Sequence, residues 1–187
     1  MNAELDTTQL IAVAAALGWA SGLRLYAVVF LTGLAGHLGG VPLPSGLHLL
    51  QQPAMLWASG GLLAAEFLAD KVPWVDSLWD AVHTFIRIPA GAALAWGVFG
   101  GDQATWAMVA ALLGGTLAAT SHTAKATTRA AANTSPEPFS NLALSLAGDA
   151  LVPGMLWLSW QHPIAFFVAL TLVLVVMLAT TVVLFKF

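Results

Sequence analysis

Long apolar runs separated by short polar turns restrict the folds that this chain can adopt. The run over residues 164–185, IAFFVALTLVLVVMLATTVVLF, contains no charged residue, and similar runs recur along the chain. A helix that crosses a bilayer needs about 20 mostly apolar residues. Charged residues make up only 8% of the chain, against roughly 25% in a soluble domain, so they cannot cover a water-facing surface. These features predict an all-α integral membrane protein.

Six membrane-spanning helices are expected in a single domain that covers residues 1–187. The expected spans cover about residues 8–38, 53–72, 88–99, 103–132, 136–160 and 164–185. The first span is long and contains four glycines, so we expect a kink or a break within it. Ser135, Pro136 and Glu137 predict the start of the fifth span, as N-cap, first helical residue and first-turn acid.

Residues 75–87 are expected to form an amphipathic helix. Polar and apolar side chains fall on opposite faces of this helix, and the polar stripe consists of Asp76, Asp80, His83 and Arg87. A helix with this pattern lies in the membrane–water interface. The sequence therefore predicts an interfacial helix before a short third span.

The basic residues predict an orientation. They gather at three places: Lys71 with Arg87, Lys125 with Arg129, and Lys186 at the end of the chain. Six crossings would bring these three places to one side, which the positive-inside rule assigns to the cytoplasm. Both termini would then be cytoplasmic.

The halves of the chain, residues 1–101 and 102–187, resemble each other weakly. The first span of each half carries a cation after a patch of small residues, Arg24 or Lys125. The second span carries an acid shortly before a proline, Asp70 or Asp149. Three spans per half would make the repeats inverted in the membrane, as in many transporters with broken helices.

Acids and one arginine within the expected spans are candidate functional groups. Glu66 and Asp70 lie one helical turn apart, and ionisable groups inside spans are costly and usually face a cavity or the protein interior. They suit proton carriage or cation binding, or they lie in water near the membrane surface. Arg24 lies deep in the first span and should pair with Glu66 or Asp149. That pair would either fix helix packing or take part in substrate binding and coupling.

A cationic stripe is expected on the fourth span. His122, Lys125 and Arg129 are three and four residues apart, which puts them on one face of a helix. Surrounded by serine and threonine hydroxyls, this face would suit an anion or a water-lined path. Alternatively, Arg129 and Lys125 extend to the cytoplasmic interface.

A second polar face is expected on the fifth span. Asn141, Ser145 and Asp149 recur at every fourth residue. They would face the cationic stripe across the short turn and neutralise it.

The chain carries no enzyme signature. It has no cysteine, so disulfides, thiolate metal sites and thiol nucleophiles are excluded. Its five histidines have no metal-binding spacing, and the adjacent Ser121 and His122 point about 100° apart on a helix. With only six Lys and Arg, the chain lacks the basic surface that binds a nucleic acid. We expect no cofactor and no metal, with an enzyme assembled from several spans as the remaining alternative.

Three segments resemble a known family. They are SGLRLY, EFLADKVPWVDSLWDAVHTFIRIPAGA and SHTAKATTRAAANTSPEPFSN. Together they resemble the bacterial membrane proteins catalogued as domain of unknown function 4126, over roughly residues 10–155. The resemblance implies a small helical membrane protein and brings no activity with it. It also implies a proline directly after Arg87, whereas here Ile88 intervenes before Pro89, so a kink would be displaced.

We therefore expect a small transporter, forming a homo-oligomer in the lipid bilayer, that moves a small solute or ion through a polar site between the repeats. The expected pathway residues are Arg24, Glu66, Asp70, His122, Lys125, Asn141 and Asp149. Secondary candidates are Ser21, Asp80, Arg87, Ser121, Arg129 and Ser145. An oligomeric ion channel and a non-transporting membrane scaffold are the alternatives.

Overall fold

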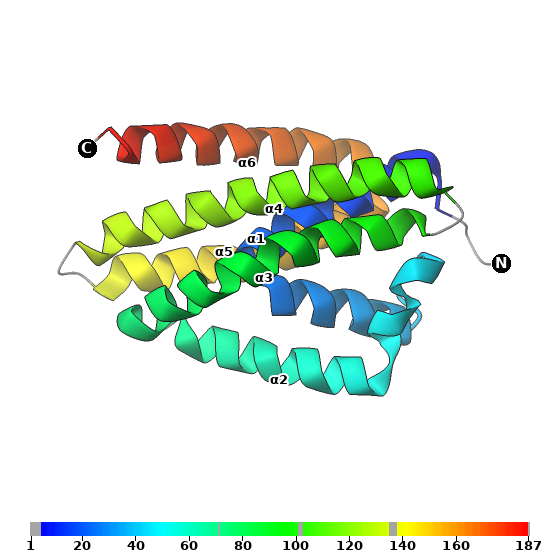
Figure 1. Cartoon of the computed structure of the whole chain (residues 1–187), viewed down its shortest axis with the longest axis horizontal. Helices are drawn as coiled ribbons and strands as arrows, with labels where there is room; N and C mark the ends of the chain where they lie inside the picture. The colour runs from blue at the N-terminus through cyan, green and yellow to red at the C-terminus, as the bar shows by residue number, and fades with distance from the viewer. Residues whose placement is uncertain (1–4, 71, 101–102, 135–137, 187) are drawn as a thin grey trace.

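A computed structural model describes residues 5–70, 72–100, 103–134 and 138–186 of the chain. Within these ranges the helices pack side by side into one elongated bundle, with α2 and α6 along opposite edges (Figure 1). The elements are α1 (Thr7–His37), the 3-10 helix η1 (Ser45–Gln51), α2 (Pro53–Ala69), α3 (Pro73–Phe99), α4 (Ala104–Asn133), α5 (Pro138–Gln161) and α6 (Pro163–Leu184). The all-α prediction is confirmed.

The starts of the helices follow from local sequence. Asp6 caps α1 by accepting a hydrogen bond from the backbone N–H of Gln9 (2.8 Å), and the Gln9 side chain accepts one from the Asp6 N–H (3.0 Å). Pro53, Pro73 and Pro163 begin α2, α3 and α6, where a missing N–H costs no intrahelical bond.

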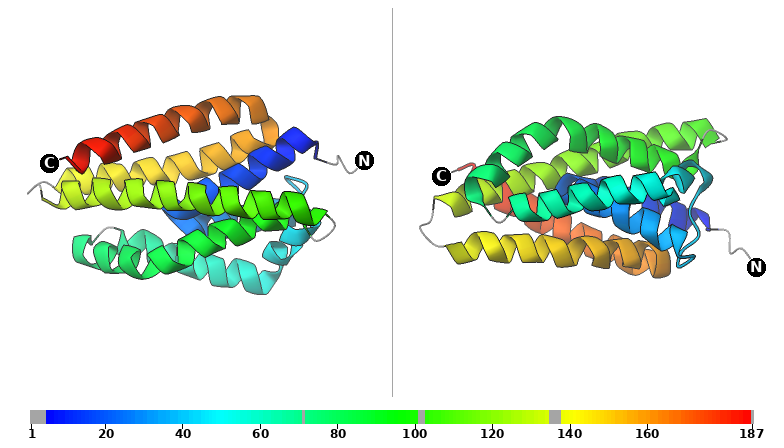
Figure 2. Two further views of the ribbon diagram at one scale, coloured as in Figure 1. Left: turned by 45° about the horizontal axis from the view of Figure 1, so that its top comes forward. Right: turned by 90° about the horizontal axis from the view of Figure 1, so that it is seen from below.

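α1 does not run straight through the bundle. The backbone of Arg24 is non-helical (φ −147°, ψ 76°), and the chain turns back there, so both ends of α1 lie at the same end of the bundle (Figures 1 and 2). On the first arm, Gln9 donates a hydrogen bond to the carbonyl of Trp160, near the end of α5 (3.1 Å). On the second arm, Gly33 lies against the backbone of Leu50 in η1. The predicted break is confirmed, and it falls at the arginine.

The prediction of six spans is not confirmed. Within the described part of the chain, five helices are long and apolar enough to cross a membrane: α1, α3 from Leu78 onward, α4, α5 and α6. α2 has only 17 residues, and α1 returns to the end of the bundle from which it starts. The predicted orientation counted α1 as one crossing, and it also counted Arg87 and Arg129 as loop charges, although both are buried. Lys71 lies outside the described residues.

α3 corrects the prediction of an interfacial helix followed by a short span. It is one helix from Pro73 to Phe99, with Pro89 inside it. Its polar residues Asp80, His83 and Arg87 are buried, whereas its exposed apolar side chains are Val75, Leu78, Val82 and Ile86. The amphipathic pattern is real, but in a bilayer the apolar face turns to lipid and the polar face turns to the protein interior. The side chain of Asp76 lies outside the described residues.

The last three predicted spans agree with α4, α5 and α6 to within a few residues. The predicted N-cap signal at Ser135, Pro136 and Glu137 lies outside the described residues. The predicted repeat stays a prediction. α1 is bent, whereas α4, its expected counterpart, has no non-helical residue among those described for it.

Glycines allow α3 and α4 to approach closely the part of α1 that precedes the bend. A Cβ atom added to Gly18 of α1 would overlap the backbone of Gly114 in α4, and one added to Gly22 would overlap the backbone of Ala118. Gly114 in turn lies against Ala95 and the carbonyl oxygen of Gly91, both in α3. Small residues in such positions let helix backbones pack tightly in membranes. Gly18 and Gly22 are therefore positions of close contact between α1 and α4.

This packing predicts that Gly18→Ala destabilises the bundle. The new methyl group would meet backbone atoms that cannot rotate away, and such overpacking costs about 1–3 kcal/mol. Gly61→Ala is the matched control, because an added Cβ there has no atom within 4 Å among the described residues. Thermal unfolding in detergent micelles should show a lower midpoint for Gly18→Ala and no loss for Gly61→Ala. Equal midpoints for the two variants would contradict the close packing.

Candidate functional site

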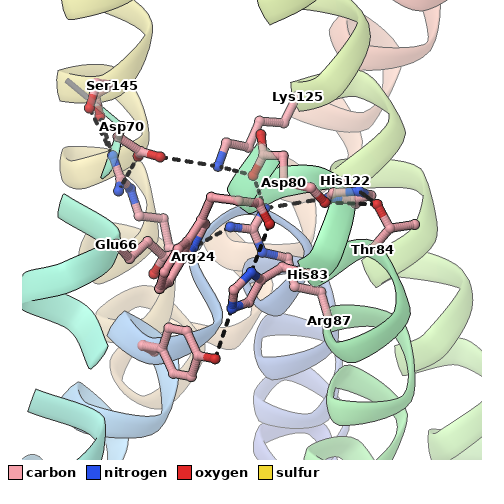
Figure 3. A network of polar contacts seen from close by, with 12 residues as sticks. Arg24, Glu66, Asp70, Asp80, His83, Thr84, Arg87, His122, Lys125 and Ser145 are labelled. Carbon is pink, nitrogen blue, oxygen red and sulfur yellow. Dashed lines mark hydrogen bonds and ion pairs between the residues drawn. The ribbon is translucent and has the colours of Figure 1, made fainter. Parts of the chain in front are cut away.

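Arg24 stands at the bend of α1 and connects it to two other helices (Figure 3). Its guanidinium forms one ion pair with Asp70, the C-cap residue of α2, and another with Asp149 of α5, from Nη2 to Oδ1 at 2.9 Å. Nη2 also donates to the hydroxyl (3.0 Å) and to the carbonyl (3.2 Å) of Ser145. The prediction that Arg24 pairs with Glu66 or Asp149 is confirmed for Asp149, and Asp70 is a partner that was not predicted.

Arg87 of α3 forms the second centre of the site. Its Nη2 atom lies 2.7 Å from Oε1 of Glu66, and its Nη1 atom lies 2.7 Å from Oδ1 of Asp80. The side chains of Arg87 and Glu66 are 0% exposed, so water does not screen this pair. Oε2 of Glu66 has no hydrogen-bond partner among the described residues.

Lys125 and Arg129 of α4 connect the two centres. Nζ of Lys125 lies 3.0 Å from Oδ1 of Asp80 and 3.7 Å from Oδ1 of Asp70. Arg129 lies 3.5 Å from Oδ2 of Asp70 and donates to its backbone carbonyl at 3.3 Å. The alternative in which Arg129 extends to the interface is wrong, because its side chain is buried against Asp70.

These residues form a single buried network, which we call the charge cluster. Its members are Arg24, Glu66, Asp70, Asp80, Arg87, Lys125, Arg129 and Asp149. It contains four cations and four carboxylates, so its formal charge is zero. Isolated charges are expensive to bury, and removing one partner leaves the other uncompensated. The balance of charges explains how so many ionised groups can lie inside a membrane bundle.

Two histidines border the charge cluster. Nδ1 of His122 lies 3.4 Å from Nη1 of Arg87, which can only donate, and its Nε2 lies 2.7 Å from the hydroxyl of Thr84. The Nδ1–H of His83 donates to the carbonyl of Trp79 (2.7 Å), and its Nε2 lies 2.9 Å from the hydroxyl of Tyr26. Both rings thus connect the charge cluster to hydroxyl groups of α1 and α3.

Three predicted site residues serve helix contacts instead. Ser21 donates to the carbonyl of Leu17 in its own helix (2.5 Å), and Ser121 donates across to the carbonyl of Trp19 (2.7 Å). Asn141 donates to the side chain of Asn133 (2.7 Å), which ties α5 to the end of α4. The predicted polar face of α5 is thus divided, because Ser145 and Asp149 contact Arg24 and Asn141 contacts α4.

Tyr26, Thr84 and His83 lie at the site although no role there was predicted for them. Tyr26 lies two residues after the bend, and it is the only tyrosine of the chain. Thr84 contacts His122, which is also a partner of Arg87, and His83 contacts Tyr26. The polar stripe of α3 contained part of this signal, because His83 belongs to it.

A cavity of about 280 Å³ adjoins the charge cluster, and Arg24, Lys125 and Arg129 contribute to its wall. Among the described residues, no group of three or more His, Asp or Glu side chains is arranged to hold a metal ion. The cationic wall therefore suits an anionic group, which guanidinium and ammonium groups bind through charge-assisted hydrogen bonds.

The network predicts that Asp70→Asn destabilises the protein far more than Asp149→Asn. Asp70 has a fully buried side chain and faces three cations, whereas Asp149→Asn leaves Arg24 paired with Asp70. Removing one partner of a buried ion pair costs about 3–5 kcal/mol, because the other charge is left uncompensated. Thermal unfolding of both variants in nanodiscs is the measurement. Similar losses at the two positions would show that the number of cations around a carboxylate does not set its contribution to stability.

Comparison with known proteins supports the resemblance seen in the sequence. No curated protein and no solved structure matches the chain. The profile of the family described as Domain of unknown function (DUF4126) matches residues 11–182, a range that reaches from α1 into α6 and includes the whole charge cluster. The chain therefore belongs to the DUF4126 family.

Proposed function

We propose that this protein is a small multi-pass membrane transporter in which the charge cluster is the substrate and coupling site. The observation that carries the proposal is the bend of α1 at Arg24, in the middle of the bundle, at the residue that joins Asp70 and Asp149. Transporters commonly place their sites near the bilayer midplane at interrupted helices. Non-helical backbone at that depth persists only where protein encloses it or where it borders a cavity, and Arg24 does border one.

Glu66 is the proposed coupling group. One of its oxygens pairs with Arg87, and the other has no hydrogen-bond partner among the described residues. Protonation would remove one negative charge from a neutral cluster and leave it with a charge of +1, which an anionic substrate would balance. Arg87 would keep its second carboxylate, Asp80. The ionisable groups around Glu66 are Arg24 and Tyr26 of α1, Asp70 at the end of α2, Arg87 of α3 and Lys125 of α4.

Proton flux into liposomes tests this proposal. Purified protein is reconstituted with a pH-sensitive dye inside, and the dye is followed after a pH jump and in gradients of sodium, potassium and chloride. We expect flux with wild type and none above protein-free liposomes with Glu66→Gln. The matched control is Ser59→Ala, on the same face of α2 two turns earlier, whose hydroxyl donates only within its own helix (to Met55 carbonyl, 2.6 Å).

A double variant separates transport from a structural role. Glu66→Gln alone leaves the cluster with a charge of +1 and should cost about 3–5 kcal/mol, whereas Glu66→Gln with Arg87→Gln restores a formal charge of zero. We expect the double variant to regain thermal stability without regaining flux. Flux that survives in a folded Glu66→Gln protein contradicts the coupling role. Ohmic current would favour a channel, and wild type that is silent in every gradient would favour a scaffold.

We propose further that the protein forms a homo-oligomer in a bacterial inner membrane and catalyses no reaction. The prediction of two cytoplasmic termini assumed six crossings. In the structure the start of α1 and the end of α6 lie at opposite ends of the bundle (Figure 1), so this prediction is not retained.

A further inference from the structure

The cavity beside the charge cluster lies between four helices. It has a volume of about 280 Å³ and is bordered by residues of α1, α4, α5 and α6. Most of its wall is apolar, and the side chains that supply this surface include Leu23, Leu144, Leu151, Val176 and Met177. Ligand sites are commonly apolar pockets of roughly 300–1,000 Å³ with a few fixed polar groups. This cavity, at about 280 Å³, lies just below that range.

One part of the wall is cationic. Arg24, Lys125 and Arg129 border the cavity, and none of the described residues that line it is acidic. Their carboxylate partners Asp70, Asp80 and Asp149 belong to the charge cluster and are not among the residues that line the cavity. The cavity therefore presents three positive groups at one side and hydrocarbon over the rest. This combination complements a ligand with an anionic head and an apolar tail.

The mouth of the cavity opens at an apolar surface. Leu151 of α5 and Val176 of α6 both line it, and they are 40% and 63% exposed. Both helices are long and apolar enough to cross a membrane, so their exposed side chains face lipid chains. α6 lies along the edge of the bundle (Figure 1), which leaves its outer face to the bilayer. A ligand would thus enter from the membrane interior.

We propose that the cavity binds an amphiphilic anion, with a carboxylate or phosphate head against Arg24, Lys125 and Arg129 and an aliphatic tail along α5 and α6. This inference rests on the proposed function, for which it names the substrate class. The cavity accommodates the head and the first part of the tail, and the remainder lies in the bilayer. The same chemistry is present in a free single-chain anion and in the headgroup of an anionic phospholipid.

Binding of radiolabelled dodecanoate to the protein in phosphatidylcholine nanodiscs tests the inference, with empty nanodiscs as background. Unlabelled dodecyl phosphate should displace the probe, whereas dodecanol and dodecyltrimethylammonium should not. Nanodiscs doped with phosphatidylglycerol identify the source of the ligand. Loss of dodecanoate binding there indicates a phospholipid headgroup, and unchanged binding indicates a free amphiphile. Displacement by dodecyltrimethylammonium as strong as that by dodecyl phosphate would overturn the inference.

Two variants on α6 test the position of the tail. Thr180 lines the cavity and Thr171 does not, and each hydroxyl donates to the carbonyl four residues earlier in the helix (2.8 Å). Thr180→Phe should fill the cavity and weaken dodecanoate binding about tenfold or more, and Thr171→Phe should bind as wild type. Equal binding by the two variants would overturn the proposed position. These residues lie outside the charge cluster, so the comparison does not depend on removing a buried charge.

One variant tests the head. Arg129→Gln should weaken dodecanoate binding and leave Asp70 paired with Arg24 and Lys125. If a folded Arg129→Gln protein binds dodecanoate with wild-type affinity, Arg129 does not bind the anionic head.

The two proposals can fail separately. Dodecanoate binding without any flux in liposomes would refute transport and leave a binding site for amphiphilic anions. Flux that depends on Glu66, without dodecanoate binding, would refute the substrate class and leave transport.

Discussion

The bend of α1 at Arg24 is the constraint on which the rest of the structure depends. A non-helical residue leaves nearby backbone groups without their usual partners, and lipid cannot supply any. The bend therefore requires α3, α4 and α5 around it, and α1 is accordingly the most buried long helix among the candidate spans. The guanidinium of Arg24 joins Asp70 at the end of α2 to Asp149 within α5. One side chain thus fixes where two other helices lie relative to the bend.

Electrical balance and close packing support each other around that bend. Buried ion pairs stabilise a fold only when every charge has a partner, and the charge cluster meets this condition with equal numbers of cations and carboxylates. The helices that carry these charges can approach closely because Gly18 and Gly114 have no side chains at their contact. The same arrangement turns the cations Arg24, Lys125 and Arg129 toward a cavity with an otherwise mostly apolar wall. The proposed transport site and the proposed site for amphiphilic anions both rest on this one asymmetry.

Local sequence was a good guide wherever helical periodicity alone decided the outcome. The spacing of His122, Lys125 and Arg129 placed them on one face of α4, and the limits of α4, α5 and α6 followed from their apolar runs. It failed for α3, where the helix with the polar stripe of Asp80 and Arg87 was predicted to lie in the membrane–water interface. Periodicity shows that two faces of a helix differ in polarity, but it does not show which face contacts lipid.

The sequence by itself determined an all-helical membrane protein with ionisable groups inside its apolar helices. It also determined that the first helix would break and that Arg24 would need an acidic partner. Only the tertiary structure decided that the break falls at Arg24 and reverses the chain. That reversal brings Asp70 to Arg24 and leaves Glu66 for Arg87. Partners in space depend on how helices far apart in the chain cross, and a single dihedral change at residue 24 redirects everything before or after it.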